Sequence, residues 1–203
     1  MKYKLKQVAV VPYKMIKELK SQLIDLLDQQ LSNETLFYLI GSNLGWVRVL
    51  LLANYEDLRP EDVDDLDIIE DIVPMCKEII EKIKEDIKEQ SDKYILHEYN
   101  EDFTEPIGTH LSAKYKVSLG VVEDVISAIM GIQETKTIRA EDIDNILEDV
   151  EETLLKGFPS LDCIRIENLN TIEIVKIYRK YFDLGITLLT KKKGHQQQNQ
   201  RSR

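Results

Sequence analysis

The sequence predicts a mainly α-helical protein with bundle-like packing of roughly six or seven helices. Apolar residues recur every three or four positions over most of the chain, and capping residues, Gly and Pro separate the periodic segments. Hydrophobic residues make up 43% and charged residues 32% of the 203 residues, as in folded domains. We therefore expect one helical domain over residues 1–190, with residues 97–116 as the place where it would divide.

The N-terminal segment Tyr3–Val11 is the main exception to helical periodicity. It alternates Lys with apolar residues and then runs through β-branched residues to Pro12, which is typical of a strand. A lone strand cannot pair its own backbone groups, so it needs a partner. The best partner within the chain is Cys163–Glu167, where apolar and charged residues also alternate. These two segments are expected to form a small two-stranded ribbon.

The first predicted helix spans Tyr13 to Leu31. Its apolar stripe consists of Ile16, Leu19, Leu23, Leu26 and Leu27. The spacing is close to a heptad repeat, so the stripe can also join two copies of the chain. A homodimer is therefore one expected assembly.

The most apolar stretch, Leu36–Ala53, follows a predicted N-cap at Ser32 or Asn33. Its length approaches that of a membrane-spanning helix. However, Arg48 lies inside it, and a central Arg costs about 2.5–3.5 kcal/mol in a membrane. The stretch therefore predicts one core helix with its Trp46 buried, and no transmembrane segment.

Two prolines organise the next part of the chain. Pro60 suits the first turn of a helix and is followed by acidic residues, which favour helix N-termini. Pro74 ends or kinks that helix and starts another, which runs to about Leu96. From residue 97 to residue 116 the periodicity fades, which predicts a loop.

Three helices are predicted in the C-terminal part. The first covers about residues 121–130, and the second begins near Arg139 and ends at Lys156-Gly157, a common helix stop. The third follows a capping box formed by Asn170 and Glu173. Residues 191–203 are basic, Gln-rich and without apolar residues, which predicts a disordered tail.

Charge and cysteine content narrow the function classes. The net charge of −10 argues against duplex nucleic acid binding by the folded body, which would need clustered Lys and Arg. The same charge favours a basic protein partner. Cys76 and Cys163 have no metal-binding spacing and read as two buried, reduced thiols. With no secretory signal at the N-terminus, we expect a cytoplasmic protein.

Sequence motifs for catalysis are missing from the chain. It contains no Walker A loop, no GxGxxG, no GxSxG, no HExxH and no EF-hand loop. These absences leave no catalytic residue to assign and favour a protein that is not an enzyme. No cofactor is expected.

Two weak metal-binding arrangements are nevertheless worth testing. His97, Glu101 and His110 would supply imidazole and carboxylate ligands if their loop folds back. Glu141, Asp144 and Glu148 recur at three- and four-residue spacing on one helix face, and carboxylates on facing helices can hold Mg²⁺. An ordinary surface loop and a solvated helix face explain the same residues.

The acidic helix faces also bear a limited resemblance to a known enzyme family. Glu78-x-x-Glu81 and Glu141-x-x-Asp144 are similar to the ExxE and ExxD elements of all-α nucleoside triphosphate pyrophosphatases. The two elements lie farther apart here than in that family. The resemblance implies a metal-dependent phosphohydrolase as an alternative function.

The reading that the sequence favours is a non-catalytic protein that binds another macromolecule, as an adaptor, an inhibitor or an assembly factor. The partner's identity does not follow from the sequence. A second alternative uses the tail, in which Lys191, Lys192 and Lys193 would contact RNA or an anionic membrane surface.

Overall fold

The structure is a computed structural model, and it describes residues 3–27, 32–89, 95–111, 140–181, 183 and 186–187. It confirms a mainly α-helical fold with small β ribbons. The first half of the chain forms strand β1, helices α1, α2 and α3, and strand β2; their bounds are Lys4–Leu5, Tyr13–Leu27, Asn33–Ser42, Leu44–Asn54 and Tyr55–Glu56.

The chain continues with a short helix α4, a π-helical turn η1, the long helix α5 and the strands β3 and β4. Their bounds are Pro60–Asp64, Ile68–Ile72, Val73–Lys88, Ile95–Tyr99 and Pro106–Leu111. Helix α7 spans Ala140–Gly157, the short helix α8 spans Cys163–Ile166, and residues 171–181 are helical.

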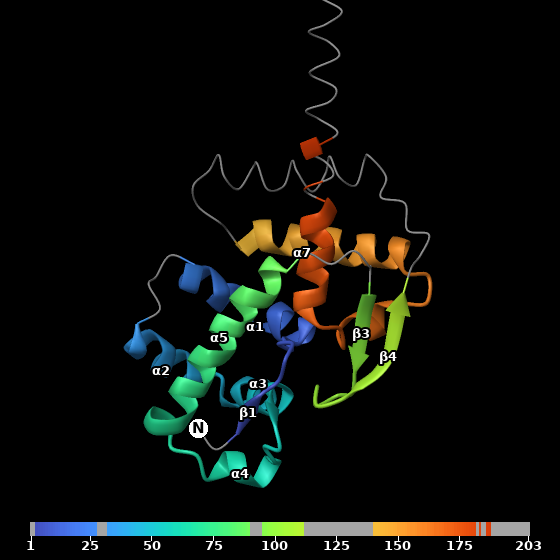
Figure 1. The fold of residues 1–203 in the computed structure, drawn as a ribbon. Coiled ribbons are helices and arrows are strands. Elements are labelled where there is room, and N and C mark those ends of the chain that lie inside the picture. Colours follow the sequence, from blue (N-terminus) through green and yellow to red (C-terminus); the bar gives the residue numbers. More distant parts are fainter. Residues whose placement is uncertain are drawn as a thin grey trace, which may run out of the picture.

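Figure 1 shows the arrangement of these elements. Most of them belong to one of two groups, each packed around a hydrophobic cluster. Helices α2 to α5 surround what we call the N-terminal cluster, whose buried residues include Ile40, Leu51, Tyr55 and Ile79. The second group consists of α7, α8, strand β3 and residues 171–181. Within each group, the apolar side chains hold the elements together because packing removes these side chains from water.

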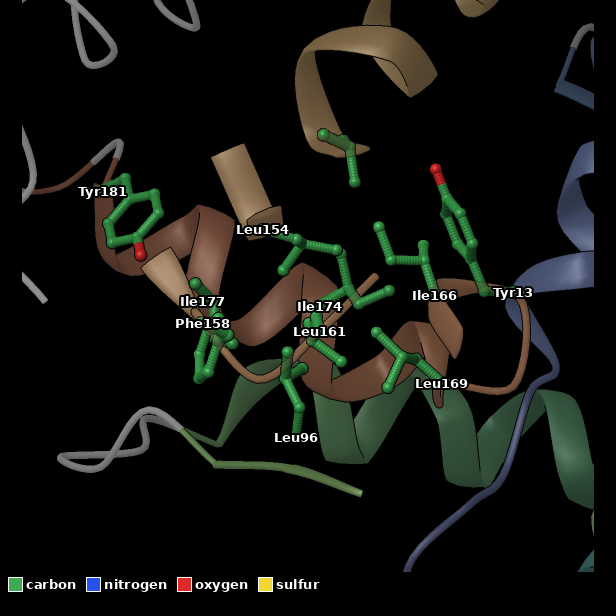
Figure 2. Close-up of a cluster of buried hydrophobic side chains, with 11 residues drawn as sticks. Tyr13, Leu96, Leu154, Phe158, Leu161, Ile166, Leu169, Ile174, Ile177 and Tyr181 are labelled. Carbon is green, nitrogen blue, oxygen red and sulfur yellow. The ribbon is translucent and has the colours of Figure 1, made fainter. Parts of the chain in front are cut away.

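The second group encloses what we call the C-terminal cluster. Figure 2 shows its side chains converging from α7, α8 and the final helical residues, with Tyr13 and Tyr181 at opposite ends. The hydroxyl of Tyr13 donates to the Leu147 carbonyl oxygen at 3.3 Å. The first residue of α1 is thereby anchored to α7, which ties the two groups together.

The extended segment Ala9–Val11 is buried between the two groups. Its main chain bonds to three buried side chains: the Ala9 N–H donates to Asp86 (2.7 Å), the Val10 N–H to Asn54 (2.8 Å) and the Val11 N–H to Asn170 (3.0 Å). Two of these side chains also donate back, Asn54 to the Val10 carbonyl (2.8 Å) and Asn170 to the Ala9 carbonyl (2.9 Å). Side chains thus take the place of neighbouring strands in satisfying a buried backbone.

The ribbon predicted between Tyr3–Val11 and Cys163–Glu167 is wrong in its partner. Strand β1 pairs antiparallel with β2, so Lys4 lies opposite Glu56. Residues Cys163–Ile166 are helical because the Asp162 side chain caps them, accepting from the Ile164 and Arg165 N–H groups at 3.1 and 2.9 Å. The N-terminal segment does run beside that region: Pro12 and Asn170 form an isolated antiparallel bridge.

The single helix predicted over Leu36–Ala53 is also wrong, since Asn43 divides it into α2 and α3. The Asn43 side chain donates to the Leu39 carbonyl oxygen at 3.1 Å and to Gln22 at 2.6 Å. This side chain replaces the main-chain donor that would have continued the helix. Among the described residues no single helix is long and apolar enough to cross a membrane, and the α2–α3 pair, which has the length together, is bent by 103°.

The predicted loop at 97–116 contains an ordered antiparallel hairpin instead. Strands β3 and β4 pair with Leu96 opposite His110 and His97 opposite Thr109. The Asn100 side chain builds the turn by accepting from the Thr104 N–H at 2.9 Å, an arrangement for which Asn is well suited. The helix that begins near Pro74 accordingly ends at Lys88 rather than near Leu96.

Other predicted helix signals have mixed outcomes. Ser32 caps α2 and the helix near Arg139 ends at Gly157, both as predicted. The predicted capping box fails because the Glu173 carboxylate accepts from His97 rather than from the Asn170 N–H. The helix expected at residues 121–130 lies outside the described residues.

Candidate functional site

An apolar pocket opens where α1, α2, α3 and α5 meet. It has a volume of about 210 Å³. Its lining is almost entirely aliphatic, with Trp46 as its aromatic member and with Gln22 and Asn43 as its polar residues. The Asn43 amide donates to the Gln22 side chain at 2.6 Å. The two polar groups therefore satisfy each other and leave an apolar surface for an occupant.

Helix α2 forms one wall of this pocket, and its central residues, Leu36–Ile40, are apolar on all sides. Leu36 and Ile40 are buried in the N-terminal cluster and Leu39 lines the pocket. On the outer side, Phe37 is 48% and Tyr38 is 73% exposed. A helix that is apolar all round is normally buried in a larger assembly. The outer face of α2 is thus a surface suited to contact with another molecule.

Trp46 contributes to the same surface. The structure places it partly buried at the pocket wall, with its indole Nε1 donating to the Glu18 carboxylate at 2.9 Å. Trp46 was predicted to be a core residue, and the structure places it half-buried at the edge of the core instead. Trp is the residue type most enriched at binding hot spots because it offers a large apolar face together with a polar group.

A second, polar pocket of about 250 Å³ lies at η1 and the start of α5. Four carboxylates line it, from Asp62, Asp65, Glu70 and Asp71. The guanidinium of Arg59 contacts Asp62 at 3.0 Å, and Arg48 pairs with the neighbouring Asp64. The surrounding surface is therefore strongly acidic and only partly neutralised.

Polar side chains, of which Glu98 and His110 are buried, form a network between the β3–β4 hairpin and α8. The His110 imidazole is 4% exposed; its Nε2 lies 3.0 Å from the Glu98 carboxylate and its Nδ1 lies 2.8 Å from the Ser160 hydroxyl. Arg165 donates from Nε and Nη2 to the same carboxylate, at 3.0 and 2.6 Å. Glu98 and His110 meet because residues at alternate positions of paired strands share one face.

Arg165 sets the charge state of this network. Its guanidinium lowers the pKa of Glu98 by hydrogen bonding, which outweighs the opposing effect of burial. Arg165 also donates from Nη1 to the Ser160 carbonyl oxygen at 2.9 Å. One side chain thus fixes both the carboxylate and the turn that carries Ser160.

His97 lies on the opposite face of the hairpin from His110. Its imidazole Nδ1 is 2.5 Å from one carboxylate oxygen of Glu173, and its main-chain N–H donates to the other oxygen at 2.6 Å. Burial raises the pKa of Glu173. The structure therefore does not bring His97 and His110 to a shared metal site, and Glu101 is exposed in the turn between the strands.

The other predicted site residues are separated from this network. Asp144 on α7 forms an ion pair with Lys20 of α1, and Glu148 is exposed. Glu141 lies in the first turn of α7. In the ranges described by the structure, no group of three or more His, Cys, Asp or Glu is arranged to hold a metal ion. Lys191, Lys192 and Lys193 lie outside these ranges, so the tail contact stays a prediction.

Sequence reasoning missed Ser160, Arg165 and the role of Glu98. These residues were missed because the hairpin was not predicted. Leu96 and Glu98 are two positions apart and both buried, which is the pattern of a strand with one buried face. Cys163, predicted to be buried, is exposed on α8, whereas Cys76 is buried at the apolar pocket.

Comparisons with known proteins add no relative. No protein family, curated protein or solved structure matches this chain. The candidate sites are therefore judged by their own geometry and chemistry.

Proposed function

We propose that the chain is a binding protein whose apolar pocket receives an apolar side chain from an amphipathic helix of a protein partner. The observation that carries the proposal is the pocket itself, aliphatic and open, beside the exposed Phe37 and Tyr38 of α2. Amphipathic helices bind such grooves through apolar anchors at positions i, i+3 or i+4, and i+7.

The size of the pocket favours a side chain over a whole small molecule. Its volume of about 210 Å³ is below the roughly 300–1,000 Å³ of typical small-molecule sites. One or two anchoring side chains that fill a dry pocket can dominate the energy of a protein interface. The surrounding Phe37, Tyr38 and Leu44, all exposed, would then contact the body of the partner helix.

The charge of the chain favours a partner with basic residues. The net charge is −10, and opposite charges raise association rates and improve specificity. The predicted homodimer is a competing use of the same helices. However, Ile16 packs against the buried Ala9–Val11 segment, so this residue of the stripe already has partners within the chain.

The test uses a library of random 16-residue peptides displayed on phage and selected against the full chain. Selected peptides should carry apolar residues at helical spacing together with Lys or Arg. Val47→Trp fills the pocket from α3, and we expect it to weaken binding of a selected peptide at least about tenfold, or 1.4 kcal/mol. The matched control is Ile107→Trp on β4, where Ile107 is exposed and binding should be unchanged.

Two results would contradict the proposal. One is a set of selected peptides without apolar anchors, and the other is equal binding to both Trp variants. Light scattering on the purified chain separates the homodimer: a stable dimer that Val47→Trp dissociates would identify a second copy as the occupant. Circular dichroism of each variant verifies that the fold is intact.

A further inference from the structure

The polar network at the hairpin has the connectivity of a nucleophilic serine site. The Ser160 hydroxyl lies 2.8 Å from His110 Nδ1, and His110 Nε2 lies 3.0 Å from Glu98. In a neutral imidazole one nitrogen donates and the other accepts. Because a carboxylate only accepts, Nε2 carries the hydrogen and Nδ1 is left to accept from Ser160. We propose that Ser160 is a nucleophile that takes acyl groups from activated esters.

The burial of the three side chains supports these roles of nucleophile, base and acid. Ser160 is exposed, whereas His110 and Glu98 are 4% and 5% exposed. The hydroxyl thus faces the outside while the base and the acid lie behind it, away from competing water. Serine nucleophiles on unrelated folds combine a nucleophile, a base and an orienting acid at hydrogen-bond distances. The same three groups meet here with the imidazole nitrogens exchanged, since Nδ1 rather than Nε2 faces the serine.

The position of Ser160 is fixed from both sides. It lies in the turn between α7 and α8, where the Leu161 N–H donates to the Phe158 carbonyl oxygen at 2.9 Å and Arg165 donates to the Ser160 carbonyl oxygen, also at 2.9 Å. Phe158 and Leu161 are themselves buried in the C-terminal cluster. A rigid turn holds the hydroxyl at the imidazole and lowers the entropic cost of reaction.

Arg165 acts as a positioning residue. Its three hydrogen bonds to Glu98 keep the carboxylate ionised and oriented. An ionised Glu98 stabilises the imidazolium that forms when His110 accepts the serine proton. The arginine therefore acts through Glu98 and needs no contact with a substrate.

The reaction balances with these groups alone and with water as the second reactant. Oγ of Ser160 bonds to the ester carbonyl carbon and its proton moves to His110 Nδ1. The carbon–oxygen bond to the leaving alcohol then breaks, and that alcohol takes the proton from Nδ1. Water later attacks the acyl-serine in the same way and releases the acid.

The probe is a fluorescent fluorophosphonate, which forms a phosphorus–oxygen bond to an activated serine and releases fluoride. The full chain should be labelled once, at Ser160, as located by mass spectrometry. Ser160→Ala should abolish labelling, and His110→Gln should slow it at least about 100-fold, the loss expected when a general base is removed. Hydrolysis of p-nitrophenyl acetate should fall in the same two variants.

The matched control is Ser42→Ala, which removes another exposed serine hydroxyl, bonded to the Tyr38 carbonyl oxygen at 2.9 Å. Its labelling should equal that of the unmodified chain. Circular dichroism guards against unfolding, and Ser160→Ala removes one surface hydroxyl, so it keeps the fold. A folded chain in which Ser160 stays unlabelled, or is labelled equally with His110→Gln, would overturn the proposal and leave a structural network.

Discussion

The N-terminal and C-terminal clusters differ in how completely they are filled. The C-terminal cluster encloses Tyr13, Phe158 and Tyr181, each at most 2% exposed. The N-terminal cluster borders the apolar pocket and the exposed aromatic side chains of α2. The difference suggests a division of labour, in which one half supplies stability and the other half offers a surface.

The largest expected effect comes from breaking the link between the two halves. Asn170 is 0% exposed; it accepts from the Val11 N–H and the Ile172 N–H and donates to the Ala9 carbonyl. Asn170→Ala leaves these buried groups without a partner, and each unsatisfied group costs about 1–3 kcal/mol. We expect a loss of about 3–5 kcal/mol in the free energy of unfolding, measured by urea denaturation.

Trp46, the one tryptophan of the chain, lets the same experiment follow each half. Its fluorescence reports on the N-terminal group, whereas circular dichroism reports on all helices. In Asn170→Ala we expect the two transitions to separate. The control Asn33→Ala, at an exposed residue that pairs with Lys77, should change stability by less than about 0.5 kcal/mol. Coincident transitions in Asn170→Ala would show that other contacts couple the halves.

The next effect compares the packing of the two clusters directly. Leu154 is 1% exposed in the C-terminal cluster, so Leu154→Ala should cost about 2–5 kcal/mol through lost burial and a new cavity. Leu39 lines the existing pocket and is only partly buried, so Leu39→Ala should cost about 1 kcal/mol. Urea denaturation measures both. Equal losses would mean that the pocket wall is packed as tightly as the core.

The smallest expected effect concerns two glutamates on the hairpin and the final helical residues. Arg165 lowers the pKa of Glu98, so the stability from Glu98 is present above its ordinary value of 4.5 and is lost as the pH falls through the lower folded-state pKa. Burial raises the pKa of Glu173, so its stability is present below 4.5 and is lost as the pH rises through the higher folded-state pKa.

Paired substitutions test the two signs. Relative to the unmodified chain, Glu98→Gln should be most destabilising at neutral pH, with a smaller deficit in acid. Glu173→Gln should show the reverse, with its deficit shrinking as the pH rises above 4.5. Stability measured by urea denaturation at several pH values gives both curves. Parallel curves for the two variants would contradict the opposite environments of these carboxylates.

Helical periodicity predicted the fold class well, but side-chain contacts decide where some of the helices end or break. The helix that ends at Gly157 and the cap at Ser32 depend on local signals, which a sequence displays directly. The break at Asn43 depends on an amide that bonds to Leu39 and Gln22, and the latter lies 21 residues away. Such a long-range contact leaves no local pattern.

The candidate site residues also depend on long-range contacts that local sequence patterns do not reveal. His110 was noticed because histidine often carries chemistry, but its partners Ser160 and Glu98 lie 50 and 12 residues away. A hairpin and a turn bring them together, and neither was predicted. The apolar pocket was missed for a related reason: it forms where four helices fail to fill the space between them, which periodicity cannot reveal.

The burial of Ala9–Val11 also constrains the order in which the chain can fold during synthesis. The acceptors of its N–H groups lie 77, 44 and 159 residues further along. During synthesis Asn54 and Asp86 are made early, whereas the Val11 N–H has to wait until Asn170 has left the ribosome. Contacts between residues so far apart in sequence slow folding, so completing the hydrogen bonds of Ala9–Val11 is expected to be a late step.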